Sequence, residues 1–204
     1  MFAKFAKLTA IVMVLPAALT IAAPSKRDGV CGDGVGDFEK SFTLATFFKD
    51  QPNSPVGTPL VLSPHGHIPD TVQPGGIDFF VLTSYASYAH FDFNVYIMHD
   101  GWVDAYGSDG RIALSTNITP GIEAQFYTTP GPQTIAPNVY CGLPGTSKYG
   151  ADNANHARFA VGTDADNFAL CPDGNVTTVF YQPAAAVSQA GCVPVDILLI
   201  PTSD

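Results

Sequence analysis

Short runs of apolar, β-branched and aromatic residues alternate with turn residues along the chain after residue 27. No segment there repeats apolar residues at the spacing of an amphipathic helix, and all 19 glycines and 15 of the chain's 17 prolines interrupt this part of the sequence. This pattern predicts many short strands. The expected strands are 42–48, 60–63, 78–82, 91–98, 102–106, 111–115, 123–127, 158–161, 168–171, 177–181 and 193–200. We therefore expect one all-β domain, an antiparallel sandwich or a barrel-like fold with long loops, one of them at 142–156.

One hairpin is specific enough to predict its register, because strand 91–98 alternates apolar and polar residues up to the turn at Asp100-Gly101. A two-residue turn would pair Ile97 with Asp104 and place a carboxylate on the apolar face. A three-residue turn, His99-Asp100-Gly101, would pair Ile97 with Val103 and keep that face apolar. We therefore expect the three-residue turn.

In that register, Tyr96, Trp102, Asp104 and Tyr106 share the face of the hairpin opposite to the core. Aromatic rings beside a carboxylate can form a platform on which sugars stack, so these four residues are the candidate glycan-binding site. Aromatic side chains in β-proteins more commonly pack beneath another sheet or a long loop. The sequence leaves both interpretations open.

The first 27 residues indicate where the protein works. A short basic start is followed by an apolar run at 8–22, too short to span a bilayer comfortably. This pattern is typical of a secretory signal peptide at 1–22. A short propeptide at 23–27 would follow, ending in Lys26-Arg27, and the domain would comprise residues 28–204. We expect a secreted protein, located outside the cell or in the cell wall.

The net charge of the chain becomes more negative once this leader is removed. The chain carries 9 Lys and Arg against 18 Asp and Glu, and four of the basic residues lie within the first 27. The remaining five leave residues 28–204 with a formal charge of −13. Such an acidic domain repels nucleic acids and anionic lipid headgroups. We expect a monomer that binds neither nucleic acid nor membrane.

Four cysteines remain after the leader, an even number that suggests two disulfides in a secreted chain. Of the three pairings, we favour Cys171–Cys192, which would link the last strands, and Cys31–Cys141, which would tie the N-terminal segment to the body. Two sequons, at Asn117 and Asn175, predict N-linked glycans on surface loops.

Candidate chemistry is sparse. The sequence contains no nucleophile elbow, phosphate-binding loop or dinucleotide fingerprint, so we predict neither a catalytic residue nor a cofactor. His65, His67 and Asp70 are weak candidates for a metal site, because they lie in a segment that reads as a loop. A glycoside hydrolase would need two facing carboxylates, for which Asp104 and Glu123 are candidates of unknown geometry.

The layout resembles a fungal family. A leader ending in Lys-Arg precedes Ser41-Phe42-Thr43-Leu44-Ala45, and the chain later contains Phe168-Ala169-Leu170-Cys171-Pro172-Asp173-Gly174, Val179-Phe180-Tyr181 and Gly191-Cys192-Val193-Pro194-Val195. These features resemble small secreted cell-wall proteins of the PhiA type, whose relatives are IgE-binding or hypersensitive-response-inducing proteins. The resemblance implies a barrel-like domain, a cell-wall location and no established catalytic residues.

These observations lead to a non-enzymatic, cell-wall-associated fungal protein, either structural or recognised by a host like an elicitor or allergen. The expected partner is a cell-wall polysaccharide or a host receptor. A carbohydrate-binding module or lectin is the alternative, and a glycoside hydrolase is the weakest of the three.

Overall fold

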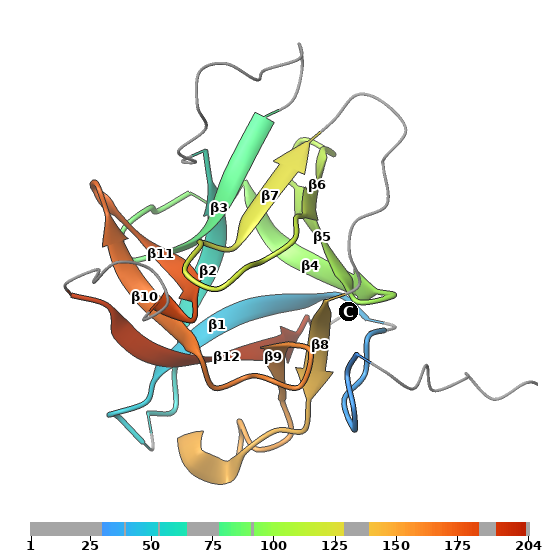
Figure 1. Cartoon of the computed structure of the whole chain (residues 1–204), viewed down its shortest axis with the longest axis vertical. Coiled ribbons are helices and arrows are strands. Elements are labelled where there is room, and N and C mark those ends of the chain that lie inside the picture. Colours follow the sequence, from blue (N-terminus) through green and yellow to red (C-terminus); the bar gives the residue numbers. More distant parts are fainter. Residues whose placement is uncertain are drawn as a thin grey trace, which may run out of the picture.

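The computed structural model describes residues 30–38, 40–52, 54–64, 78–90, 92–128, 139–183 and 191–202. These residues form an all-β fold (Figure 1). The strands are β1 (Phe42–Phe48), β2 (Thr58–Ser63), β3 (Asp78–Ser84), β4 (Phe93–His99), β5 (Trp102–Gly107), β6 (Ile112–Ser115), β7 (Gln125–Thr128), β8 (Tyr140–Leu143), β9 (Ala157–Val161), β10 (Phe168–Asp173), β11 (Val176–Tyr181) and β12 (Val193–Pro201). A short 3₁₀ helix, η1 (Ser147–Tyr149), follows β8.

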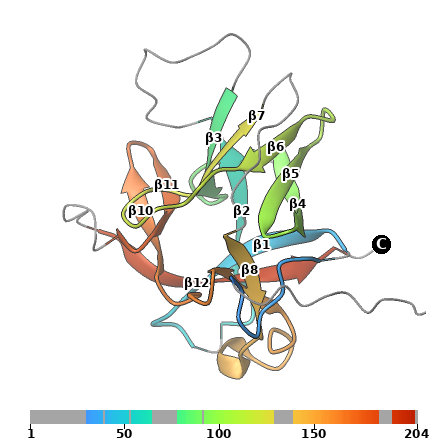
Figure 2. The ribbon, with the colours of Figure 1, turned by 45° about the vertical axis from the view of Figure 1, so that its right-hand side comes forward.

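Nine antiparallel strands close into a barrel in the order β1-β4-β5-β6-β7-β3-β11-β10-β12. The ring closes where β12 returns to β1, with residues paired from Phe42↔Pro201 to Phe48↔Val195. Strand β2 is additional and pairs with both β1 and β3. Strands β9 and β8 extend the sheet from the free side of β12, below the barrel in the views of Figures 1 and 2.

One large apolar cluster fills the barrel, because alternate residues of each strand point inward. Aromatic side chains supply much of its volume, among them Phe42, Tyr96, Phe126, Tyr140 and Phe168, all at most 1 % exposed. The buried phenols keep a partner: Tyr96 Oη donates to the carbonyl of Leu60 at 3.3 Å. The core therefore supports the fold and leaves the outward side chains available for function.

The strand predictions are confirmed along the chain, with ends that differ by a few residues. Strand β8 was missed. It lies partly in the segment 142–156 that we expected to be a loop, and the rest of that segment is irregular apart from η1. The reason is its length and content, since four residues that include a cysteine and a glycine carry little strand signal.

The predicted register of the β4–β5 hairpin is wrong. The turn has two residues, Asp100 and Gly101, and Ile97 pairs with Asp104. Both turn residues have positive φ, 51° and 79°, as a type I′ turn requires. Strand β4 is apolar on both faces and contains a bulge between Phe93 and Val95, so apolar alternation specified its register weakly.

Both disulfides form as predicted, Cys31–Cys141 and Cys171–Cys192, with Cα atoms 5.5 Å and 4.1 Å apart. The part of the chain that the structure describes contains no helix long and apolar enough to cross a membrane. The leader and propeptide predictions fall on residues 1–27, which lie outside the described residues.

Candidate functional site

The outward side chains of β5 form a line of alternating aromatic and acidic groups: Trp102, Asp104 and Tyr106, called here the β5 strip. Strand register places His99 beside Trp102, and Ile97 beside Asp104. Trp102 and Tyr106 are four residues apart, so at about 3.3 Å per residue they lie about 13 Å apart along the strand. Both rings are half-buried and in part reachable from solvent. The strip is therefore long enough to contact more than one sugar ring.

The fourth predicted member of this site, Tyr96, lies elsewhere. Its side chain is 0 % exposed and points into the barrel core, stacked on Phe42. Burial raises the pKa of its phenol, as expected for a group enclosed by apolar side chains. The two-residue turn is the cause, because it turns Tyr96 and Met98 inward and leaves Ile97 and His99 on the outer face.

His99 takes the place of Tyr96 in the site. Its Nε2 lies 3.1 Å from Oδ2 of Asp104, and its ring lies edge-on to Trp102 with centroids 5.6 Å apart. The sequence prediction placed this histidine in a three-residue turn and did not include it among the candidate site residues. The signal that could have found it is the Asp-Gly turn, because a two-residue turn pairs the residues on either side of it, His99 and Trp102.

Asp104 is the buried charge of the site, with only 10 % of its side chain exposed. Burial raises the pKa of its carboxyl, and the nearby imidazole of His99, which favours the ionised form, offsets only part of that effect. Burial also raises the pKa of the Tyr106 phenol, and the charge of Asp104 adds to the increase. The β5 strip therefore combines ring surface with a carboxylate shielded from water.

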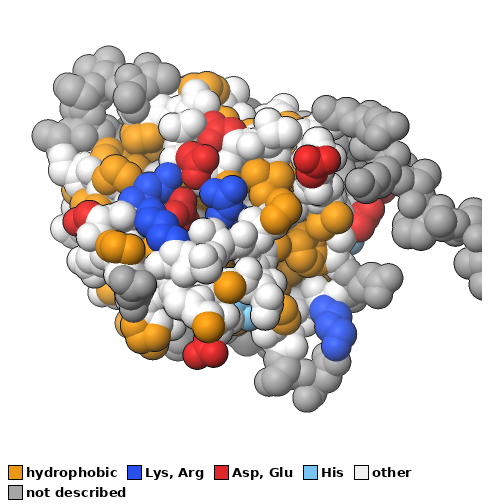
Figure 3. All heavy atoms as spheres, turned by 90° about the horizontal axis from the view of Figure 1, so that it is seen from below, with side chains coloured by type: hydrophobic (Ala, Val, Ile, Leu, Met, Phe, Trp, Pro, Cys, Tyr) orange, Lys and Arg blue, Asp and Glu red, His pale blue; other side chains and the backbone are white. Residues whose placement is uncertain are grey.

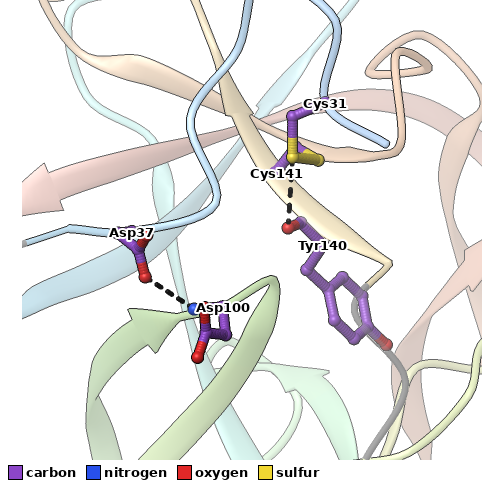
Figure 4. Close-up of a disulfide and its surroundings, with 5 residues drawn as sticks. All are labelled: Cys31, Asp37, Asp100, Tyr140 and Cys141. Carbon is purple, nitrogen blue, oxygen red and sulfur yellow. Dashed lines mark hydrogen bonds between the residues drawn. A yellow bond between two sulfur atoms is a disulfide. The ribbon is translucent and has the colours of Figure 1, made fainter. Parts of the chain in front are cut away.

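The N-terminal segment, residues 30–38, holds the hairpin turn in place (Figure 4). The backbone N–H of Asp100 donates to Oδ1 of Asp37 at 2.6 Å, and that of Gly101 donates to the carbonyl of Gly36. The approach is close, since a Cβ added to Gly36 would lie 3.3 Å from the Gly101 nitrogen. The Cys31–Cys141 disulfide anchors this segment to β8, and so it supports His99 and Trp102 indirectly.

A second polar group, the basal cluster, lies on the lower face of the molecule, where basic side chains gather around acidic ones (Figure 3). It consists of Lys49, Lys148, Tyr149, Arg158, Asp166 and Asp196. Asp196 is 3 % exposed, accepts a hydrogen bond from the Tyr149 hydroxyl, and has Lys49 Nζ at 3.2 Å and Lys148 Nζ at 3.5 Å. Arg158 pairs with Asp166 at 3.0 Å.

Sequence reasoning missed the basal cluster, and no local pattern could have revealed it, because its members come from distant segments. Its cations already have carboxylate partners, so its arrangement is that of a structural network that stabilises a buried carboxylate.

The carboxylates considered for glycoside hydrolysis lie apart. Asp104 pairs with Leu114 on β6, and Leu114 pairs with Tyr127 on β7, so Asp104 and Tyr127 lie at the same level of the sheet. Glu123 forms a β-bridge with Phe180. It precedes Tyr127 by four residues, so it lies about 13 Å from the level of Asp104 along the strands. Hydrolase pairs are about 5 to 9.5 Å apart, so these two residues do not form one.

The other predicted site residues divide into two groups. Asn117 and Asn175 of the sequons are both exposed. His65, His67 and Asp70 lie outside the described residues. Among the residues that are described, no group of three or more His, Cys, Asp or Glu side chains could hold a metal ion.

Comparison with known proteins adds no further constraint: no protein-family model, curated protein or solved structure matches this chain.

Proposed function

We propose that this protein is a non-enzymatic, extracellular carbohydrate-binding protein that associates with the fungal cell wall through the β5 strip. The observation that carries the proposal is the alignment of Trp102, Asp104 and Tyr106 on the outer face of one strand. Aromatic rings offer the apolar faces of sugars a flat contact surface, and a carboxylate accepts hydrogen bonds from their hydroxyl groups.

Rigidity supports this assignment. A preorganised site loses less conformational entropy on binding than a mobile one. The strip lies on a barrel strand that pairs on both sides, with β4 and β6. The turn beside it is held by hydrogen bonds to the disulfide-linked N-terminal segment. The backbone that carries Trp102, Asp104 and Tyr106 therefore keeps its position before a ligand arrives.

The location is supported by separate features. The leader pattern predicts secretion, and two disulfides suit an oxidising compartment. The resemblance to secreted cell-wall proteins of the PhiA type points to the fungal wall. A wall-associated protein without a catalytic centre would be retained there by contacts with polysaccharide, which is the role we assign to the β5 strip.

The test is a pull-down of the purified protein on insoluble chitin and β-glucan. We expect the native protein to bind at least one of them and Trp102→Ala to lose most of that binding. Tyr88→Ala is the matched control, because Tyr88 is also a half-buried aromatic residue but lies after β3 and outside the strip. Retention of full binding by Trp102→Ala, or failure of the native protein to bind either polymer, would overturn the proposal.

A further inference from the structure

Two polar atoms of the β5 strip are buried and have no hydrogen-bond partner among the described residues: Oδ1 of Asp104 and Nε1 of Trp102. Buried polar atoms in proteins are nearly always paired, and a buried carboxylate oxygen without a partner is costly. The two atoms have complementary roles, since an indole N–H only donates and a carboxylate oxygen only accepts. They belong to residues two apart that point to the same side of β5.

His99 is a side chain that contacts both Asp104 and Trp102. It contacts the carboxylate through Nε2 and the indole through its ring edge, as described above, yet 46 % of its own side chain is exposed. A half-exposed side chain can change rotamer without disturbing the core. Rotation of His99 would release Asp104 and Trp102 from these contacts while the strand stays in place.

This inference rests on the proposed carbohydrate binding and specifies its chemistry. We propose that one hydroxyl group of an uncharged oligosaccharide displaces His99, accepts a hydrogen bond from Trp102 Nε1 and donates one to Asp104 Oδ1. A hydroxyl group fits because it is both donor and acceptor through a single oxygen. The polar pair thus recognises the sugar, and the rings of Trp102 and Tyr106 provide the stacking surface.

The negative charge of the protein disfavours the binding of acidic glycans at this site. The ligand would meet a carboxylate on a chain whose formal net charge is −9 even with its leader. Arg111, which precedes β6, is already bound by Asp109 and lies 3.4 Å from a carboxylate oxygen of Asp78. A uronate or sulfate group would therefore be repelled without a compensating cation. The strip, about 13 Å long, is long enough for more than one sugar ring to contact it.

The experiment is titration calorimetry of the purified protein with three soluble probes: chitohexaose, laminarihexaose and hexagalacturonate. We expect binding to at least one of the two uncharged probes and none to hexagalacturonate. Trp102→Phe keeps an aromatic ring but removes the N–H, and Asp104→Asn removes the charge. Each is expected to weaken binding about tenfold or more, the effect of one strong hydrogen bond. Asp50→Asn, an exposed residue in the turn after β1, controls for the loss of one negative charge.

Two further variants test the shared hydroxyl and the displaced histidine. Because one hydroxyl serves both residues, the Trp102→Phe/Asp104→Asn double variant should lose little more affinity than either single variant. His99→Ala should bind severalfold more tightly, since the ligand no longer has to displace the imidazole.

The outcomes separate this inference from the function on which it rests. If Trp102→Phe and Asp104→Asn bind like the native protein while Trp102→Ala does not, stacking alone holds the sugar and the polar pair is wrong. Tighter binding of hexagalacturonate than of both uncharged probes, or loss of binding in His99→Ala, would also overturn it. Failure of the native protein to bind any probe or polymer would instead remove the proposed function itself.

Discussion

At the residue scale, two partly buried carboxylates have opposite surroundings. Asp164 accepts hydrogen bonds from Asn167 at 2.8 Å, Tyr181 at 2.9 Å and Gln182 at 3.1 Å. Burial alone would raise the pKa of its carboxyl, but these donors outweigh burial and hold that pKa below its usual range. Asp104 has one described partner, His99, and burial keeps its pKa raised. Ionisation of Asp164 therefore stabilises the folded state, whereas ionisation of Asp104 does not.

The lowered pKa of Asp164 determines the direction in which the stability of the folded state changes with pH. The ionised carboxylate stabilises the folded state above the unfolded pKa, near 3.9, and this contribution disappears as the pH falls through the folded pKa. We expect Asp164→Asn to reduce the free energy of unfolding by about 1 kcal/mol at pH 7 and by much less at pH 3. Urea unfolding at both pH values measures this. An equal loss at both would show that the charge is not involved.

The raised pKa of Asp104 has the opposite effect on how stability changes with pH. A raised folded pKa means that the folded state binds the proton more tightly than the unfolded state, so this group favours folding more as the pH falls towards about 4. We expect Asp104→Asn to be at least as stable as the native protein at pH 7, with the difference shrinking at pH 4.5. Thermal unfolding at the two pH values provides the measurement. A clear destabilisation at pH 7 would indicate that the carboxylate has a structural role.

At the element scale, short segments attach to the barrel through few but specific contacts. The turn between β4 and β5 depends on Gly101, whose φ of 79° suits glycine and whose carbonyl accepts the backbone N–H of Tyr140. On the lower face, η1 is fixed by Tyr149, which packs against Phe47 with ring centroids 4.9 Å apart and donates to Asp196. Each contact converts an irregular segment into a fixed support.

Replacing Gly101 tests the turn. We expect Gly101→Ala to cost about 1 to 2 kcal/mol of stability, because an L-residue is strained at this φ. Carbohydrate binding should weaken as well, since His99 and Trp102 flank the turn. Urea unfolding and the pull-down would be measured together, with Gly110→Ala as control, because Gly110 also has positive φ, 84°, but lies in the next turn. Equal loss of binding in both variants would contradict a specific role for the β4–β5 turn.

Replacing Tyr149 tests the attachment of η1. Tyr149→Phe keeps the packing on Phe47 but leaves the buried Asp196 without its hydroxyl donor, which should cost about 1 to 3 kcal/mol. Tyr140→Phe is the matched control, because the Tyr140 hydroxyl donates to a neutral carbonyl, that of Thr116, at 3.4 Å. We expect Tyr140→Phe to lose less unfolding free energy than Tyr149→Phe. A larger loss in Tyr140→Phe, measured by chemical denaturation, would contradict the importance of the contact with Asp196.

At the scale of the whole molecule, closure of the barrel joins distant parts of the chain. Strand β1 pairs with β12 along its entire length, so the first and last described strands are neighbours. The Cys31–Cys141 disulfide spans 110 residues and Cys171–Cys192 spans 21. The longer connection restricts the unfolded chain more, and it also secures the segment that supports the β5 strip.

The two disulfides should therefore differ in their contribution to stability. By loop-entropy reasoning, Cys31→Ser/Cys141→Ser should lose about 5 kcal/mol and Cys171→Ser/Cys192→Ser about 3 kcal/mol. Urea unfolding of the two double variants gives the comparison. Carbohydrate binding should fall more in the first. The reverse order of stability would argue that local packing, rather than chain entropy, dominates.

Several features of the fold could be predicted because each is a local property. Strand positions follow from alternation and turn residues, as for β1 and β10–β12, and an even cysteine count indicates two disulfides without fixing which cysteines pair. The candidate site was predicted in part: Trp102, Asp104 and Tyr106 do share a face, whereas Tyr96 does not. The error came from one residue of register, which moves every side chain of a strand to the other face.

By itself, the sequence determined the all-β class, most strand positions, a cysteine count that fits two disulfides, and the acidic charge, because these depend on local pattern and composition. Only the tertiary structure decided that Tyr96 fills the core, that His99 contacts Asp104 and Trp102, and that the basal cluster forms around Asp196. These depend on strand register and barrel closure, which bring residues from separate strands and loops together. Of these contacts, only the pairing of His99 with Trp102 has a local sequence signal, the Asp-Gly turn between them.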